Sequence, residues 1–376
     1  MPRELLLHIG CHKTGTTTIQ HTLKANGAAL EAQGHCFVAP EGQATLHQAI
    51  GPVAWGKVAR QGFHVRNAAL LRRLFAEAPQ DRVIASSENF SFFFRPQHIR
   101  QLAALVHDYF DRVRIIVYLR RQDSHAVSHH QEGAKNNRHA EAEIFGSGTT
   151  SLPWNGPGLD QYLDYNTRIG YWLDTFGEDN VIVRVWDRET LLQGDAWHDF
   201  AVTAGLDPAG LDVSKNLNVS YGMTKTKLGH LMNAQDVPPD LRGLIMRALP
   251  DDAPQMPARI EAQRFYDRYR AGNVALNARL GGRDGSDLFS DDFSSYPEDP
   301  CETWTEQSAN QAISLLLGAM NDWHADVGVP QLRAAARLAK QADKTELALR
   351  LICAAERLRP HGTLIARLKA ELDGQA

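Results

Sequence analysis

A loop close to the start of the chain contains the residue types that bind an oxyanion. It holds Lys13, Gly15 and threonines at positions 14, 16, 17 and 18. The apolar run from Leu5 to Ile9 before it predicts a buried strand, and a helical pattern follows. A strand that enters a helix through such a loop directs backbone N–H groups and hydroxyls toward one point, at the positive end of the helix dipole. The loop therefore predicts a site for a phosphate or a sulfate.

The residue order in this loop differs from that of nucleoside triphosphatases. A Walker A loop places its Lys directly after the last Gly, whereas Lys13 precedes Gly15 here. The sequence also has no obvious Asp at a strand end that would hold Mg²⁺. A nucleotide-dependent kinase of the P-loop class is therefore a disfavoured alternative function.

Two further polar clusters follow predicted strands. Ser86 to Asn89 end the apolar strand at about 81–88, and Arg120 to Ser128 follow the strand Val113 to Leu119, which is dense in β-branched residues. Strands that alternate with helices predict a parallel α/β sheet. Because such sheets bind ligands beyond the carboxyl ends of their strands, we expect the three clusters to form one site.

The segment from Lys13 to Thr17 resembles the 5′-phosphosulfate loop of sulfotransferases that use 3′-phosphoadenosine 5′-phosphosulfate (PAPS). The stretch from His8 to Thr17 is similar to the opening of the bacterial, carbohydrate-type branch. A second family hallmark is an Arg at a strand end with a Ser eight positions later, and Arg120 and Ser128 have this spacing. The resemblance covers about residues 5–290.

The resemblance implies a P-loop-like fold, with a central parallel sheet flanked by helices, and transfer of a sulfuryl group from PAPS to a hydroxyl or amine. The product would be 3′-phosphoadenosine 5′-phosphate (PAP), and no metal is expected. We expect Arg120 rather than Arg121 to bind the 3′-phosphate. The residues that the resemblance assigns to the cosubstrate are Lys13, Thr14, Gly15, Thr16, Thr17, Thr18, Arg120 and Ser128. A late segment that closes over the 3′-phosphate has the candidates Lys215, Asn218, Ser220, Lys225 and Lys227.

Two residues are expected to be catalytic. Glu88 matches the position at which related enzymes place a His or Glu that accepts the acceptor's proton, and Lys13 would neutralise charge on the bridging oxygen of the leaving nucleotide. Four histidines compete with Glu88 for the role of base: His12, His47, His129 and His130. The candidates for contact with the acceptor are His12, Asn89, His129, His130 and Trp154.

The composition limits the partners. A net charge of −4, with 40 basic against 44 acidic residues, disfavours nucleic acid as a partner. No apolar stretch approaches the length of about 20 residues that a membrane span needs, and the first strand leaves no room for a signal peptide. We therefore expect a cytoplasmic protein without an integral membrane segment. Scattered cysteines without zinc spacing predict no structural metal: Cys11, Cys36, Cys301 and Cys353.

The tail from Gln331 to Leu372 differs in composition from the rest of the chain and is rich in Ala, Leu and Arg. We expect an α/β domain at 1–303 and an all-α C-terminal extension at 304–376, whose part around 347–360 resembles a single tetratricopeptide (TPR) unit. One such unit must pack on the main domain or on another chain, so the extension could contact a partner protein. A non-catalytic scaffold is the second alternative function. The resemblance implies a carbohydrate or another hydroxyl-bearing acceptor.

Overall fold

The computed structural model describes residues 2–135, 143–146, 148, 150–153, 156–213, 221–324 and 328–373. Four predicted site residues, Trp154, Lys215, Asn218 and Ser220, lie outside these ranges. The chain divides into two compact units, one formed by Met1–Ser220 with Gln255–Glu302 and the other by Tyr221–Pro254 with Thr303–Ala376.

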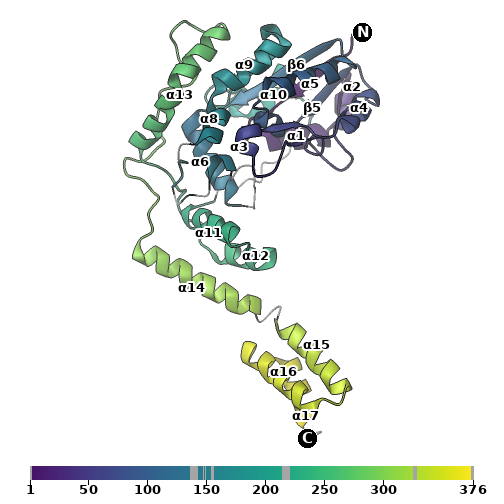
Figure 1. The fold of residues 1–376 in the computed structure, drawn as a ribbon, viewed down its shortest axis with the longest axis vertical. Helices are drawn as coiled ribbons and strands as arrows, with labels where there is room; N and C mark the ends of the chain where they lie inside the picture. The colour runs from purple at the N-terminus through teal and green to yellow at the C-terminus, as the bar shows by residue number, and fades with distance from the viewer. Residues whose placement is uncertain are drawn as a thin grey trace. The chain divides into compact units, whose positions relative to one another are not determined.

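The first unit is built on a parallel five-stranded sheet (Figure 1). Its order is β2 (His35–Phe37), β5 (Arg82–Ser86), β1 (Glu4–His8), β6 (Arg112–Leu119) and β7 (Val181–Val185). The register pairs His8 with Ser86 on one side and with Ile116 on the other. The predicted α/β fold with a central parallel sheet is confirmed.

The strands are apolar on both faces because helices cover both. In β1, Leu5 and Leu7 join the core that contains residues of α5 and α9. Leu6, between them, joins a second core with α1 and α10. Burial of each such side chain contributes about 1.5–3 kcal/mol. The β1–α1 loop (residues 9–15) is therefore anchored by the central strand of the sheet.

The helices of this unit connect and cover the strands. They are α1 (Thr16–Ala25), α2 (Gly27–Ala32), α3 (Val58–Gln61), α4 (Ala68–Ala76), α5 (Pro96–His107), α6 (Gln122–Gly133), α8 (Pro157–Leu163), α9 (Tyr165–Phe176), α10 (Ala196–Ala204) and α13 (Arg259–Arg279). Short 3₁₀ helices lie at Glu88–Phe92 (η1), Glu178–Asn180 (η2) and Leu192–Gly194 (η3).

The sequence of residues 46–78 predicts mostly helix with a break at Gly51-Pro52, and this prediction is wrong. The segment contains an antiparallel pair of strands, β3 (Ile50–Pro52) and β4 (Phe63–Val65), besides α3 and α4. Gly51 and Pro52 lie within β3 and not between two helices. Phe63 is buried in the same core as Ile50, so tertiary packing outweighs the weak local helical pattern.

The second unit is helical. It consists of α11 (Met223–Ala234), α12 (Pro239–Ala248), α14 (Glu306–Trp323), α15 (Val329–Gln341), α16 (Thr345–Leu358) and α17 (Thr363–Asp373). Small buried residues of α15 and α16, among them Ala336 and Ala348, share a cluster with Ile365 of α17. The likeness of this part to a TPR unit remains a prediction.

The observed division of the chain differs from the predicted division at 303/304 in one segment. The prediction placed residues 221–254 in the α/β domain, whereas they cluster with the helical unit. The reason is that Ile245 and Leu249 share a hydrophobic cluster with Ala319 of α14. Across the part of the chain that the structure describes, no helix combines the length and apolarity that crossing a bilayer requires.

Candidate functional site

One cavity of about 380 Å³ lies at the carboxyl ends of neighbouring strands. Its wall includes Lys13, Gly15 and Thr16 to Thr18 after β1, Glu88 after β5, and Arg120 after β6. Ser128 of α6 completes the set, and the acceptor candidates His12 and His129 line the same cavity. The three predicted clusters therefore form a single site.

The β1–α1 loop has an unusual backbone. Gly10, Lys13 and Gly15 adopt positive φ angles of 68°, 63° and 81°. For the non-glycine Lys13 this conformation costs about 1–3 kcal/mol and must be held by its surroundings. Helix α1 begins at Thr16 with no side-chain cap, which leaves the N–H groups of its first turn available to a ligand.

Thr14, Asn89 and His130 are not among the residues that line this cavity. The Thr14 hydroxyl is buried and donates to the Cys11 carbonyl at 2.6 Å. The Asn89 side-chain amide donates to the Ile50 carbonyl at 3.2 Å, and Nε2 of His130 lies 2.9 Å from the Gly148 carbonyl oxygen. The contacts of Thr14 and Asn89 stabilise the loops that bear the other site residues.

Lys13 is held by a carboxylate across the cavity. Its Nζ lies 2.9 Å from Oε2 of Glu132 on α6. Burial lowers the pKa of Lys13, the charge and hydrogen bond of Glu132 oppose this effect, and the charges of Lys135 and Arg120 lower the pKa further. The ammonium group is thus placed at the cavity by a partner that also favours its protonated form.

Glu88 begins η1, directly beyond the end of β5. Its Oε2 accepts a hydrogen bond of 2.7 Å from the Gln20 amide and lies 3.2 Å from Nε2 of His47. Burial raises the pKa of this carboxyl, but the hydrogen bond and charge of His47, the charge of His12 and the Gln20 hydrogen bond outweigh it and keep the pKa well below its usual value. Glu88 is therefore an ionised carboxylate, in the form that accepts a proton, although the lowered pKa also makes it a weaker base than an unperturbed carboxylate.

The other histidines that compete with Glu88 for the role of base occupy different positions. His12 and His129 line the cavity, with their rings stacked at 5.1 Å, and Nδ1 of His12 lies 2.8 Å from the Tyr162 hydroxyl. His47 is not on the cavity wall and contacts Glu88 instead.

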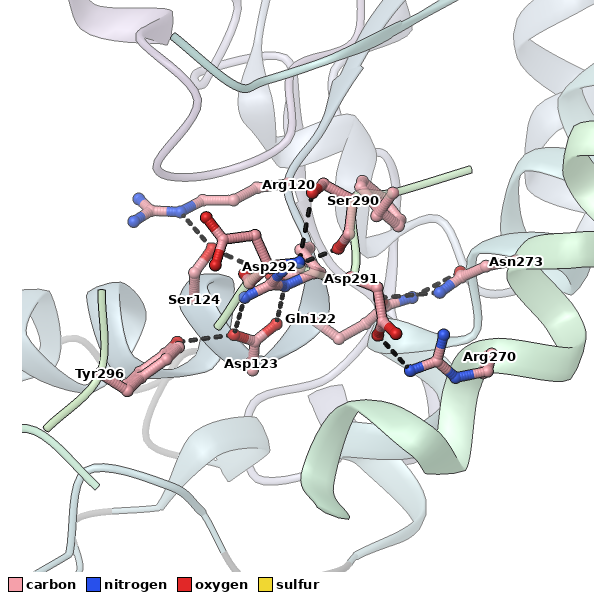
Figure 2. Close-up of polar contacts among 12 residues, drawn as sticks. Arg120, Gln122, Asp123, Ser124, Arg270, Asn273, Ser290, Asp291, Asp292 and Tyr296 are labelled. Atoms are coloured by element: carbon pink, nitrogen blue, oxygen red, sulfur yellow. Dashed lines mark hydrogen bonds and ion pairs between the residues drawn. The ribbon is translucent and has the colours of Figure 1, made fainter. Parts of the chain in front are cut away.

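Arg120 is fixed from several sides. Its Nε donates to the Ser124 hydroxyl at 2.9 Å, as Figure 2 shows, and Nη1 donates to the Lys13 carbonyl at 3.3 Å. The guanidinium carbon lies 4.5 Å from the centre of the Trp186 ring, an arrangement typical of a cation–π contact. Burial lowers the pKa of Arg120. A preorganised, partly desolvated guanidinium is suited to bind a phosphate.

Arg121 makes contacts with other parts of the chain. This supports the prediction that Arg120, rather than Arg121, binds the 3′-phosphate. Arg121 pairs with Asp123 at 2.8 Å and donates to the carbonyls of Ser290 and Asp292. Tyr296 donates to the same Asp123 carboxylate at 2.7 Å. Arg121 therefore ties the acidic stretch 286–296 to the start of α6.

Helix α6 is also fixed against α13. The Gln122 amide donates to Oδ1 of Asn273 at 2.8 Å, and the Asn273 amide donates back at 3.1 Å (Figure 2). Both side chains are buried. This reciprocal pair positions the helix that bears Ser128 and Glu132.

Comparisons with known proteins give limited results. No family model matches the chain. An uncharacterised protein of Archaeoglobus fulgidus is 29% identical over 123 residues, which are 32% of this chain and only 31% of that protein. Among solved structures, a sulfotransferase from Alicyclobacillus acidocaldarius aligns over 75% of this chain and 97% of its own, with 15% identity and a TM-score of 0.42.

Sequence reasoning missed three residues of the cavity wall: Glu132, Trp186 and Arg188. Trp186 and Arg188 follow β7, so the rule that located the other clusters would also have found them. With Arg120 they line a second cavity of about 470 Å³, bounded also by residues of the stretch 286–296, among them Phe289 and Ser290.

The remaining predictions concern two lysines of the late segment and metal ions. Lys225 and Lys227 lie on α11, in the second unit. The described residues contain no group of three or more His, Cys, Asp or Glu side chains arranged to bind a metal ion.

Proposed function

We propose that this protein is a sulfotransferase that moves a sulfuryl group from PAPS to a hydroxyl or amine, with carbohydrates or glycolipids as the acceptor class. The observation that carries the proposal is the shared cavity. A Lys-bearing loop at a helix start, an Arg with a Ser, and an ionised carboxylate line the same 380 Å³. These are the groups needed to hold two anionic ends of one ligand and to accept a proton.

The residues suit a donor with two anionic groups. The β1–α1 loop offers the Lys13 ammonium, the hydroxyls of the α1 threonines and uncapped N–H groups to the phosphosulfate. Arg120 and Ser128 would hold the 3′-phosphate. The 380 Å³ cavity and the adjoining 470 Å³ cavity share Arg120 and Trp186, and both fall in the range of about 300–1,000 Å³ that is usual for small-ligand sites.

The chain's own residues account for the transfer step. Glu88 accepts the proton of the acceptor hydroxyl as the acceptor oxygen forms its bond to sulfur. The bond between sulfur and the oxygen bridging to the 5′-phosphate breaks, and Lys13 neutralises the charge that develops on that oxygen. The N–H and hydroxyl groups of the loop stabilise the same charge, as in an oxyanion hole. The products are the sulfated acceptor and PAP.

The acceptor class rests on the sequence resemblance. Of the aromatic residues that could stack on a sugar ring, Trp172 is fully buried and belongs to the core, whereas Trp55 is 63% exposed. A carbohydrate would need an aromatic face that solvent can reach, which Trp55 offers and Trp172 does not.

A transfer assay tests this function. The enzyme is incubated with sulfate-labelled PAPS and glycan extracts of the host, and the labelled products are identified. We expect Lys13→Ala and Glu88→Gln each to lower turnover by about 10²- to 10³-fold with the fold retained. Lys24→Ala, on the same α1 helix but hydrogen-bonded to the exposed Gly42 carbonyl, is the matched control. Near-full transfer by Lys13→Ala would contradict the assignment.

A further inference from the structure

Besides the proposed base Glu88, Glu132 is a second carboxylate in a cavity whose basic residues are suited to anions. Its Oε2 lies 2.9 Å from Nζ of Lys13 and 3.1 Å from Nζ of Lys135, and its side chain is only 12% exposed. The transfer step assigned above uses Lys13 but not Glu132. A negative charge at this place repels a phosphosulfate, so its presence requires a role.

We propose, on the basis of the sulfotransferase function, that Glu132 is a positioning residue that holds the Lys13 ammonium at the cavity until the donor takes it over. Lys135 stays paired with Glu132 during this exchange. The carboxylate is therefore not left buried without a counter-charge when Lys13 turns to the donor, a situation that would be strongly unfavourable.

The surrounding geometry supports an exchange confined to one side chain. The backbone of Lys13 is fixed, because its φ of 63° is constrained by the loop and its carbonyl accepts from Arg120 at 3.3 Å. Only the flexible stem of Lys13 has to move. Ser128 and Glu132 are four residues apart on α6 and share one face of that helix, so a single helix presents a proposed phosphate ligand and the partner of Lys13 together.

Glu132 also affects the pH at which Lys13 loses its proton. The charged and titratable groups around the Lys13 ammonium come from several elements. They are Glu132 at the end of α6, Lys135 just beyond it, Arg120 after β6, Arg188 after β7, Glu88 after β5, and three histidines, His12, His125 and His129. Among those that act on the pKa of Lys13, burial, Lys135 and Arg120 lower it, and Glu132 opposes them. Loss of the carboxylate would therefore make Lys13 lose its proton at lower pH.

Glu132→Gln, made in the full-length chain, tests the proposal by calorimetric titration with PAP and by steady-state transfer rates across pH. We expect PAP to bind about 3- to 10-fold more tightly, because a repelling charge and a competitor for Lys13 are removed. We expect kcat to fall by about 10- to 100-fold, because Lys13 is no longer held in place. The alkaline limb of the rate profile should move to lower pH.

Three variants separate positioning from a merely structural role. Glu132→Asp, which keeps the charge, should recover part of kcat. Lys135→Ala should move the alkaline limb to higher pH, opposite to Glu132→Gln, because a neighbouring positive charge is lost. Glu178→Gln removes a carboxylate from the exposed pair with Arg279 and should leave PAP affinity and the pH profile unchanged.

The outcomes distinguish this inference from the function on which it rests. If wild-type protein does not bind PAP, the proposed function fails and the inference with it. If wild-type protein binds PAP while Glu132→Gln leaves both affinity and the alkaline limb unchanged, only the role of Glu132 is refuted. Should Glu132→Gln fail to fold, an unshifted limb in Lys135→Ala would refute it.

Discussion

Gly10 and Glu88 are in direct backbone contact, so that a Cβ atom on Gly10 would lie 2.7 Å from the Cα of Glu88. Gly10 also has a φ of 68°, which side-chain-bearing residues rarely adopt. The loop after β1 and Glu88, two residues beyond the end of β5, are therefore placed by one contact. Because Lys13 belongs to the first and the proposed base is the second, this contact sets the spacing of the two catalytic candidates.

Gly10→Ala should disrupt this contact. The added methyl group meets backbone atoms that cannot rotate away, and the positive φ adds strain, so we expect a loss of about 2–4 kcal/mol in the free energy of unfolding. Urea denaturation measures it. Gly27→Ala is the control, since it begins α2 with nothing within 4 Å of the new methyl group and should change stability by no more than about 1 kcal/mol. Equal stability of both variants would contradict the contact.

Arg120→Ala should affect recognition of the 3′-phosphate selectively. We expect PAP affinity to fall by about 10- to 100-fold, because a charge-assisted contact is lost, while the affinity for adenosine 5′-monophosphate, which has no 3′-phosphate, changes little. Titration calorimetry with both nucleotides gives the ratio. Arg121→Ala should lower stability, because Arg121 ties the stretch 286–296 to α6, but should preserve that ratio. An unchanged ratio in Arg120→Ala would remove Arg120 from this role.

His8 should make stability depend on pH. Burial lowers its pKa from 6.5 to about 4, with the charge of Glu88 opposing the effect. Between these two pH values the unfolded chain binds a proton that the native state does not, so the free energy of unfolding rises with pH, by up to about 3 kcal/mol in total. Urea denaturation at several pH values from about 4 to 7 measures it. His8→Asn should flatten this rise, and an equally steep profile in the variant would refute the assignment.

The site could be located from sequence because parallel sheets place strand ends at one edge. Three clusters found at separate strand ends, represented by Lys13, Glu88 and Arg120, line one cavity. The roles of individual side chains were harder to predict. Thr14 belongs to the characteristic loop, yet its hydroxyl caps the Cys11 carbonyl, and hydroxyls that bond to nearby backbone look the same in sequence as those that bind a ligand.

The contact between Glu132 and Lys13 could not be predicted from the sequence. The two residues are far apart along the chain, and only the packing of α6, fixed by the Gln122–Asn273 pair, brings them to 2.9 Å. The β3–β4 pair was missed for a related reason, because its short strands are stabilised by core contacts of Phe63 and Ile50 rather than by local propensity. Long-range contacts of this kind leave no periodic signal in a single sequence.

The most direct test of the proposed function is a calorimetric titration of the full-length protein with PAP and, in parallel, with ATP and Mg²⁺. The order of residues in the β1–α1 loop and the placement of Arg120 and Ser128 on one cavity wall predict that PAP binds and that ATP with Mg²⁺ binds more weakly. Lys13→Ala and Arg120→Ala should each weaken the PAP signal. Tighter binding of ATP with Mg²⁺ than of PAP would contradict the sulfotransferase function and favour a kinase.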